Sequence, residues 1–556
     1  MTERRTRVRF APSPTGPLHM GGVRTALYNY LYAKQKDGDF IIRIEDTDSQ
    51  RFVPGAEQYI IDALNWCGII PDEGVEDGKV VEDTSPKHPH APYRQSQRRN
   101  IYREYAEELV RKGAAYYAFD TTESLAEARA EAESRRETFI YNRKTRKQMR
   151  NSLTLPEEEV NDLLERATDW TIRFKIPEDT VVQMDDLIRG HIEVNTDTLD
   201  DKVLWKRADG LPTYHLANIV DDHLMDITEV IRGEEWLPSL PLHYLLYRAF
   251  GWEDTMPRFA HLSLLLKPDG KGKLSKRDGD KLGFPVFPLQ WINSEGEISR
   301  GYREDGYFPE AFVNMLAFLG WNPGEGDNRE LLSMEELIEA FSLDHIVKSG
   351  ARFNAEKARW YNKEYLRMKS DDELAGLLVP VLESHDLNIV ECPVCALTAG
   401  ADFRGAGADF EKHIYTRDYV RDVVSFTKER ATFVADFWDI APYLFVAPSE
   451  FEAFGLPAPF PKKDVEKFWK PENVELVRQL AAFIKDYSGP WAKEELETAM
   501  EAYIRGREWP MGKVMNTTRL ALAGAASGLG IADIVFRIGK QECAKRIETA
   551  FEQIGQ

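Results

Sequence analysis

The chain has 556 residues, which is long enough for several domains. Hydrophobic residues make up 43%, aromatic residues 11% and charged residues 30%, a composition typical of ordinary globular proteins. No apolar run of about 18 residues is present, so we expect no membrane span and no membrane partner. The 4 cysteines are too few for a disulfide scaffold, which favours a reduced, cytoplasmic protein.

The net charge of −21 argues at first sight against nucleic-acid binding. Basic residues nevertheless gather between Arg135 and Arg150, with Phe139 and Tyr141 interleaved. This segment is either a solvated charged face or a surface that contacts phosphates, and the sequence leaves both interpretations open.

The N-terminal segment predicts a strand, a loop and a helix in close succession. Val8–Ala11 has the composition of a short buried strand, and the prolines from Pro12 to Pro17 exclude a helix there. Apolar residues then recur at helical spacing from Val23 to Lys34, after His19, Gly21 and Gly22. A helix N-terminus with glycines allows a phosphate to approach its N–H groups.

A second strand, Asp39–Ile44, is followed by Glu45-Asp46-Thr47-Asp48. Ligands of open α/β sheets bind beyond the carboxyl ends of strands, although a turn with a helix cap is the alternative for these acidic residues. Residues 114–212 then interrupt the α/β pattern with the helical stretch 126–136 and the strand-like stretches 170–176 and 191–194. We interpret this region as an inserted domain.

The α/β pattern resumes with a strand over 226–232, a helix over 240–250 and a strand over 259–266. The segment Lys267–Arg277 that follows is basic and contains glycines. It is either a flexible surface hairpin or a mobile phosphate clamp. From about residue 301 onward the periodicity is mostly helical.

These motifs together resemble glutamyl-tRNA synthetases, a family of class I aminoacyl-tRNA synthetases. Arg9 to Gly21 matches the family pattern R-F-A-P-S-P-T-G-x-L-H-x-G, and Arg43 to Asp48 matches R-I-E-D-T-D. Lys273-Leu-Ser-Lys-Arg277 resembles the second class I motif, K-M-S-K-S. The general class I motif has a second histidine at the position of Gly22. The glutamyl family commonly lacks that histidine, as this chain does.

The resemblance implies an α/β fold with a Rossmann-like catalytic core, an inserted α+β acceptor-binding domain and an all-helical anticodon-binding region. The expected boundaries are 1–113 and 213–280 for the core, 114–212 for the insert, 281–365 for a connecting domain that contacts the tRNA stem, and 366–556 for the anticodon-binding region.

The activity implied by the resemblance is that of a ligase of protein biosynthesis, which joins L-glutamate to tRNA-Glu in two ATP-dependent steps. His19, Lys273 and Lys276 are the implied catalytic residues. The implied glutamate site comprises Arg9, Ala11, Ser13, Glu45, Tyr214, Asn218 and Arg232. The implied ATP site comprises His19, Gly21, Gly22, Glu235, Leu265, Leu266 and Lys276. For Arg232 the alternative is a structural ion pair with Glu234 or Glu235.

The expected cofactor is Mg²⁺ with ATP, and the expected partners are ATP, glutamate and tRNA-Glu. No zinc is expected, because the stretch after Gly113 has no cysteine and Cys392-Pro-Val-Cys395 is half a site. We expect a monomer. Charging of tRNA-Gln as well, or a non-catalytic tRNA-binding role, remain alternatives, and intact His19, Lys273 and Lys276 argue against the latter.

Overall fold

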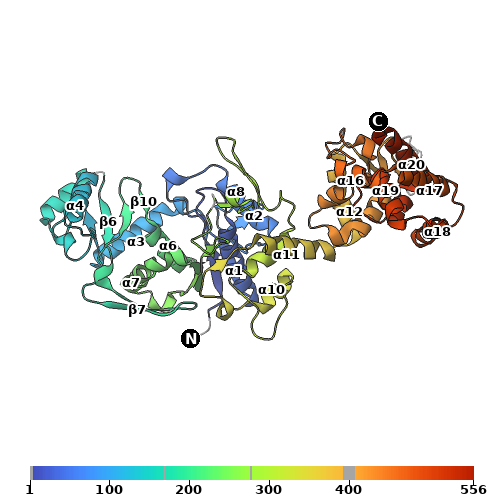
Figure 1. The fold of residues 1–556 in the computed structure, drawn as a ribbon. Helices are drawn as coiled ribbons and strands as arrows, with labels where there is room; N and C mark the ends of the chain where they lie inside the picture. Colours follow the sequence, from blue (N-terminus) through green and yellow to red (C-terminus); the bar gives the residue numbers. More distant parts are fainter. Residues whose placement is uncertain (1–3, 168, 276–277, 392–406, 556) are drawn as a thin grey trace. The chain divides into compact units, whose positions relative to one another are not determined.

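The computed structural model describes residues 4–167, 169–275, 278–391 and 407–555. The chain divides into two compact units, residues 1–361 and 362–556 (Figure 1). The expected helical and strand segments are found, with ends that shift by a few residues. The five-part division expected from the sequence stays a prediction.

The first unit is built on a six-stranded sheet in the order β2-β1-β11-β12-β7-β8. All neighbouring pairs are parallel except β7 and β8, which form an antiparallel hairpin. The strands are β1 (Arg7–Phe10), β2 (Asp39–Ile42), β7 (Val181–Asp186), β8 (Gly190–Asn195), β11 (Glu229–Gly233) and β12 (Arg258–Leu262).

The strand order places a switch point beside β1, because the chain moves from β1 to β2 on one side and later to β11 on the other. A crevice opens at such a point, outside the carboxyl ends of the strands. The hairpin β7–β8 lies within the range expected for the insert, yet it extends the catalytic sheet.

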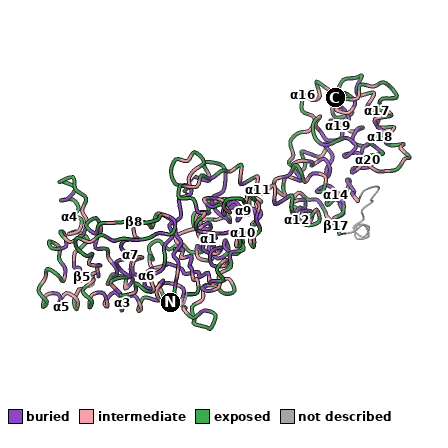
Figure 2. Tube along the Cα trace, turned by 90° about the horizontal axis from the view of Figure 1, so that it is seen from below, coloured by how far each residue is buried: buried purple, intermediate pink, exposed green. Residues whose placement is uncertain are grey.

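The helix α1 (Met20–Gln35) packs on β1, β2 and β11 and is buried along most of its length (Figure 2). Its helical spacing puts Val23, Leu27 and Leu31 on the buried face. The other helices of this unit are α2 (Ala56–Trp66), α3 (Arg99–Arg111), α4 (Thr122–Ser134), α5 (Glu157–Arg166), α6 (Tyr214–Leu224), α7 (Leu240–Phe250), α8 (Asp278–Leu282), α9 (Pro309–Ala317) and α10 (Met334–Ala340). The helix α11 (Ala355–Met368) continues into the second unit.

A second, antiparallel sheet forms within the predicted insert, in the order β10-β9-β6-β5. Its strands are β5 (Ala115–Ala118), β6 (Thr171–Phe174), β9 (Val203–Lys206) and β10 (Leu211–Pro212). Short two-stranded pairs complete the unit: β3 (Val75–Glu76) with β4 (Lys79–Val80), β13 (Leu265–Leu266) with β16 (Ala351–Arg352), and β14 (Trp291–Ile292) with β15 (Ile298–Ser299).

The second unit is helical, as predicted, but it also contains a small sheet in the order β17-β19-β18. The strands are β17 (Asn388–Val390), β18 (Ala408–Asp409) and β19 (Ile414–Thr416), and the sequence did not predict them. The helices are α12 (Asp371–Glu383), α14 (Arg417–Thr427), α15 (Asp436–Ile440), α16 (Lys462–Phe468), α17 (Pro471–Asp486), α18 (Lys493–Arg505), α19 (Met511–Ala523) and α20 (Ile531–Ile554). In the described part of the chain, no helix is both long and apolar enough to cross a membrane.

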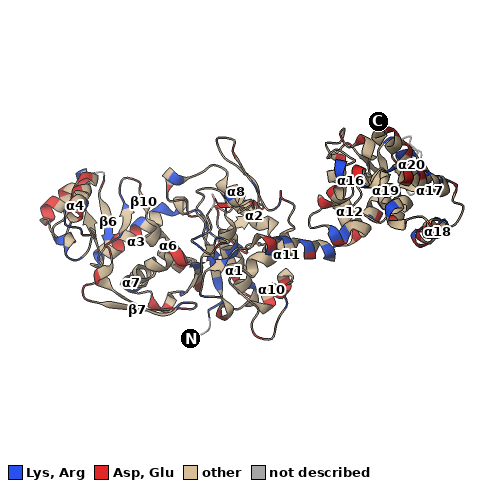
Figure 3. Ribbon diagram, viewed as in Figure 1, with Lys and Arg blue, Asp and Glu red and all other residues tan. Residues whose placement is uncertain are grey.

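The basic segment between Arg135 and Arg150 is largely neutralised by carboxylates. Acidic residues gather on the preceding helix α4 (Figure 3), and its Glu131 pairs with Arg135 at 2.6 Å. Arg143 pairs with Asp197 at 2.9 Å and Arg150 with Glu159 at 3.0 Å. Tyr141 belongs to a small apolar core with Tyr116 and Ala118. The interpretation as a bare phosphate-contacting surface is therefore not supported for these residues.

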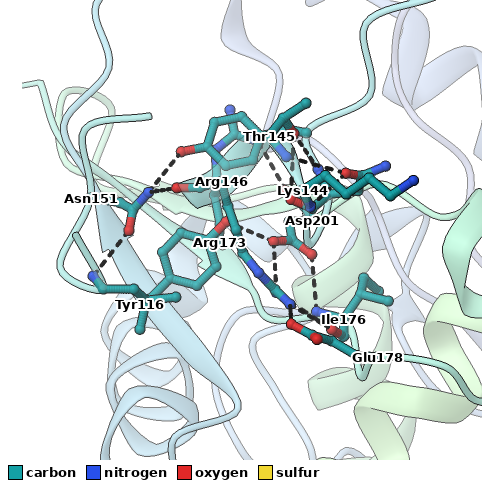
Figure 4. Close-up of polar contacts among 12 residues, drawn as sticks. Tyr116, Lys144, Thr145, Arg146, Asn151, Arg173, Ile176, Glu178 and Asp201 are labelled. Carbon is teal, nitrogen blue, oxygen red and sulfur yellow. Dashed lines mark hydrogen bonds and ion pairs between the residues drawn. The ribbon is translucent and has the colours of Figure 1, made fainter. Parts of the chain in front are cut away.

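Arg146 is the most buried basic residue of this segment and organises a polar cluster (Figure 4). Its guanidinium lies 3.1 Å from carboxylate oxygens of both Asp201 and Glu178. Asp201, which is fully buried, also accepts hydrogen bonds from the Tyr116 hydroxyl at 2.7 Å and the Ile176 amide at 3.0 Å. One carboxylate thus ties three separate segments of the insert together.

Asp201→Ala should destabilise this part of the protein strongly, since the Tyr116 hydroxyl and the Ile176 amide lose their acceptor and Arg146 loses a buried counter-charge. Each such loss costs about 1–3 kcal/mol, so a total of at least about 3 kcal/mol is expected. Denaturant unfolding monitored by circular dichroism measures the change. Arg135→Ala, which removes an exposed pair, is the control and should have little effect. Equal stability of the two variants would contradict this role of Asp201.

Candidate active site

A cavity of about 560 Å³ lies at the carboxyl ends of the parallel strands, beside the switch point. It is lined by nearly all of the site residues expected from the sequence: Arg9, Ala11, Ser13, His19, Gly21, Gly22, Glu45, Tyr214, Asn218, Arg232, Glu235, Leu265 and Lys273. Leu266 does not line it, and Lys276 lies outside the described residues. A second cavity of about 710 Å³ adjoins the first and is also lined by Lys206 and Leu211 of the insert.

Backbone hydrogen bonds join the loop after β1 to the segment that follows β2. The Arg43 amide donates to the Phe10 carbonyl and the Glu45 amide to the Pro12 carbonyl, at 3.1 and 3.0 Å. This pairing brings the segments before and after Glu45 against the proline-rich loop. The following residue, Asp46, accepts hydrogen bonds from the Ser96 amide and hydroxyl at 2.7 and 2.6 Å and is therefore structural.

His19 caps the N-terminus of α1. Its Nδ1 accepts from the Gly21 amide at 3.0 Å, so the imidazole is fixed at the rim of the cavity. A Cβ atom on Gly22 would lie 2.6 Å from Leu18 Cδ1. A histidine at position 22 would therefore force Leu18 to move, which explains in packing terms why glycine suits this position.

Two arginines and one aspartate form a buried ionic network behind the cavity. Arg9 donates from Nε and Nη2 to the two oxygens of Asp222 at 3.0 and 3.3 Å. Arg43, with no exposed surface, donates to Asp222 at 2.8 Å and to Glu45 at 3.2 Å. Burial by itself raises a carboxyl pKa, but the two guanidinium groups outweigh it and lower the pKa of Asp222.

Glu45 and Asn218 line the cavity in front of this network. Burial raises the pKa of Glu45 despite its neighbouring arginines, so a further cation in the cavity would stabilise its ionised form. With its amide oxygen toward Arg9 Nη2 and its amide nitrogen toward Asp222 Oδ2, Asn218 makes two contacts of 3.2 Å.

Arg232 is a buried cation, 5% exposed, whose described hydrogen-bond partners are all neutral. It donates from Nε to His261 Nε2 and from Nη1 to the Tyr214 hydroxyl, both at 3.0 Å. Burial lowers the pKa of Arg232, as expected for a charge moved out of water. Tyr214 in turn stacks on Trp236 with ring centroids 4.1 Å apart.

The alternative that Arg232 pairs with Glu234 or Glu235 is wrong. Glu234 is bound by Arg189 at 2.6 Å and by the Leu264 amide at 2.8 Å, whereas Glu235 pairs with Lys273 at 3.1 Å. Among the described residues, no carboxylate forms an ion pair with Arg232.

The segment that carries Lys273 is a hairpin with a fixed base. Leu266 and Lys273 are bridged as antiparallel partners, and the Leu274 amide donates to the Leu265 carbonyl at 2.8 Å. Lys267 pairs with Asp278 at 2.9 Å. The side chains of Lys273 and Glu235 are about half exposed, so their ion pair is weak and readily exchanged.

Sequence reasoning missed several residues around the cavity. Arg24 lines it and donates to the carbonyls of Leu319 and Ser263. Arg24 lies three residues after Gly21 on α1, and this closeness to the first motif could have indicated it. His261 and Asp186 were missed because neither belongs to a recognised motif.

Comparison with known proteins identifies the family. Residues 5–360 match the family described as tRNA synthetases class I (E and Q), catalytic domain, and residues 394–551 match an anticodon binding domain. The chain belongs to this class I synthetase family.

Relatives named glutamate–tRNA ligase match the chain over its whole length. The protein from Parabacteroides distasonis is 51% identical over 99% of both chains, and that from Porphyromonas gingivalis strain W83 is 50% identical over 100% of both. A crystal structure of a glutamate tRNA ligase from Elizabethkingia meningosepticum in complex with its amino acid has a TM-score of 0.87 and 48% identity, covering 99% of this chain and 100% of that chain.

Asp222→Asn should destabilise the fold by about 3–5 kcal/mol at neutral pH, because two buried arginines lose their shared counter-charge. The lowered pKa of Asp222 means that this stabilisation is present above the ordinary aspartate pKa of about 4 and is lost as the pH falls through the folded-state value. The difference in the free energy of unfolding between the wild type and Asp222→Asn, measured with denaturant, should therefore become smaller as the pH falls. A difference in unfolding free energy that does not change with pH would contradict this role of ionised Asp222.

Proposed function

We propose that this synthetase is a glutamate–tRNA ligase that activates L-glutamate with ATP and transfers it to the 3′-terminal adenosine of tRNA-Glu. The observation that carries the proposal is the buried Arg232, which pairs with no carboxylate among the described residues and lines the same cavity as Glu45. The full-length relatives named glutamate–tRNA ligase support the same activity.

The cavity offers complementary charges to each end of glutamate. The substrate ammonium group pairs with Glu45, and the side-chain carboxylate binds Arg232, with Arg9 as the second guanidinium nearby. Ala11, Ser13, Tyr214 and Asn218 complete the glutamate site. A buried carboxylate without such partners would cost several kcal/mol, so this pocket discriminates by charge as well as by shape.

The activation step needs no covalent enzyme intermediate. An α-carboxylate oxygen of glutamate attacks the α-phosphorus of ATP, the bond to the leaving phosphate breaks, and pyrophosphate departs. Mg²⁺ enters as part of the MgATP substrate. The protein's contribution is to position both substrates and to stabilise the charge that develops on the phosphate oxygens.

His19 and Lys273 face the cavity from α1 and from the hairpin, on the two sides where the phosphates are expected. Lys276 is proposed to act beside Lys273 on the motif alone. Gly21, Gly22, Glu235 and Leu265 form the rest of the ATP site, with Leu266 behind Leu265. When phosphates displace Glu235 from Lys273, the exposed ion pair is exchanged at little cost.

The adjoining cavity supplies the route for the tRNA end, because it joins insert residues to the glutamate site. A hydroxyl of the terminal ribose then attacks the activated carbonyl, and AMP leaves. Cytoplasmic location, a monomeric state and the absence of zinc stay predictions. Cys392 and Cys395 lie outside the described residues, in which no group of three or more potential metal ligands occurs.

Glutamate-dependent exchange of pyrophosphate into ATP tests the activity directly. It should be measured with glutamate and glutamine, with and without tRNA-Glu. Exchange that requires glutamate supports the proposal. Preference for glutamine, or tRNA binding without any exchange in the presence of tRNA, would contradict it.

Lys273→Ala should slow adenylate formation roughly a hundredfold, equivalent to about 2.7 kcal/mol of transition-state stabilisation. The glutamate KM should change little, because this lysine faces phosphate. Lys271→Ala, in the same hairpin and outside the cavity lining, is the matched control and should retain the wild-type rate. Equal rates for both variants would show that Lys273 is only a surface residue.

Arg232→Ala should raise the glutamate KM by roughly two orders of magnitude and leave the ATP KM nearly unchanged. Losing one partner of a buried ion pair costs about 3–5 kcal/mol, and this pair forms only with bound glutamate. Discrimination against glutamine should shrink, because a neutral amide never forms the pair. Pyrophosphate exchange with both amino acids measures this. Equal losses would make Arg232 structural and assign the side-chain carboxylate to Arg9.

A further inference from the structure

A line of buried hydrogen bonds runs away from the cavity behind Arg232. His261 Nε2 accepts from Arg232 Nε at 3.0 Å, and His261 Nδ1 lies 2.6 Å from Asp186 Oδ2. His261 and Asp186 are 0% and 4% exposed, and neither lines the cavity. Neither residue belongs to the motifs on which the family resemblance rests.

The hydrogen bonds fix the protonation of the imidazole. Arg232 Nε carries one hydrogen and can only donate, so His261 Nε2 has to accept. The proton of a neutral His261 therefore resides on Nδ1 and is donated to Asp186. Burial lowers the pKa of His261, which favours this neutral form.

Asp186 is itself fixed at the end of β7. Its Oδ1 accepts from the amides of Ile188 and Arg189 at 3.0 and 2.8 Å. Arg189 then anchors the turn between β7 and β8 to the catalytic core, donating to the His261 carbonyl at 3.1 Å and to Glu234 at 2.6 Å. Only Oδ2 of Asp186 is left to face the imidazole.

The strand register explains why these side chains meet. Arg232 on β11 and His261 on β12 are direct partners across two parallel strands, so their side chains project from the same face of the sheet. Asp186 ends the next parallel strand, β7. The three residues thus follow one another across the carboxyl edge of the sheet.

We propose that Asp186 and His261 are positioning residues that aim Arg232 at the side-chain carboxylate of the amino acid, with Asp186 selecting the imidazole tautomer that can accept from Arg232. This inference rests on the proposed function. Neither residue touches the substrate. Asp186 acts through His261, and His261 acts through Arg232.

The intervening imidazole also preserves the charge of Arg232. A carboxylate in direct contact would orient the guanidinium but would neutralise it, and a glutamate side chain would then gain less from binding. A neutral acceptor orients the group and leaves its charge for the ligand. Tyr214 and His243, which lies 3.3 Å from Arg232 Nη1, are neutral partners of the same kind.

Asp186→Asn is the sharpest test. The two backbone amides require the amide oxygen of asparagine at the Oδ1 position, so its NH₂ group would face His261 Nδ1. The imidazole proton would then move to Nε2 and face the Nε–H of Arg232. Two donors would oppose each other, and the hydrogen bond between His261 and Arg232 would be lost. The glutamate KM in pyrophosphate exchange should rise roughly 10- to 100-fold, as expected for a residue that supports a ligand-binding group. The glutamine KM should change far less.

Two variants serve as controls. Asp185→Asn removes the same charge from the neighbouring residue, which is exposed and pairs with His191, and it should behave like the wild type. His261→Gln retains an acceptor near the position of Nε2 and needs no partner at Asp186. The double variant with Asp186→Asn and His261→Gln should therefore have a glutamate KM close to that of the wild type.

The tautomer can be read in the wild type by ¹⁵N nuclear magnetic resonance of histidine-labelled protein, with His261→Gln assigning the signal. A protonated Nδ1 and a bare Nε2 are expected, and the reverse would overturn the proposal. Equal effects of Asp186→Asn on glutamate and glutamine, or effects no larger than those of Asp185→Asn, would also overturn it.

If Asp186→Asn fails to fold, the glutamate KM of His261→Gln and of His261→Leu tests the proposal instead. Only the leucine variant should raise the glutamate KM, and equal behaviour of the two would contradict the proposal. The tautomer is independent of activity, so a wild-type enzyme that does not activate glutamate would refute the proposed function and not the hydrogen-bond arrangement.

Discussion

The structure of the catalytic core depends on burying guanidinium groups at the carboxyl edge of a parallel sheet. Moving a charge out of water is costly, and the core meets that cost in two different ways. Arg9 and Arg43 share Asp222, and Arg43 also pairs with Glu45, so their charges are compensated within the protein. In the described part of the chain, the hydrogen-bond partners of Arg232 are all neutral, and burial lowers the pKa of Arg232. The guanidinium of Arg43 therefore belongs to the framework, whereas Arg232 is the group proposed to bind a ligand, and the difference lies in their partners.

Much of this arrangement could be predicted from the sequence, because local patterns encode it. The strand, proline-rich loop and helix around His19 have strong local signals, and the helix over 240–250 has the predicted limits. The motifs also identified many of the residues that line the cavity, including Arg9, Glu45 and Arg232. Resemblance supplied their roles, and the parallel strand order explains why segments far apart in sequence meet at one edge.

The rest could not be predicted, since it depends on pairing between distant segments. Nothing local to Asp186 indicates that β7 joins the catalytic sheet, or that His261 faces Arg232 across two strands. For the basic segment near Arg146, the sequence left two interpretations open, and tertiary contacts bear on the choice between them. Counting charges along 135–150 suggests a phosphate-binding surface, but its partners Asp201, Glu178 and Asp197 come from other parts of the insert. Local charge is a weak guide where tertiary contacts supply the counter-ions.

The two ends of the cavity place their charges in environments that suit different tasks. At the proposed amino-acid end, Arg232 is buried and held by several hydrogen bonds, so its position and its charge are set before a ligand binds. Such a group selects strongly, because a ligand without the opposite charge leaves it unpaired. At the proposed phosphate end, Lys273 is about half exposed and pairs weakly with Glu235. A cation of that kind binds and releases a highly charged product easily, because water solvates it at every stage. Permanent burial suits recognition of one amino acid, and exposure suits a phosphate group that has to leave in each catalytic cycle.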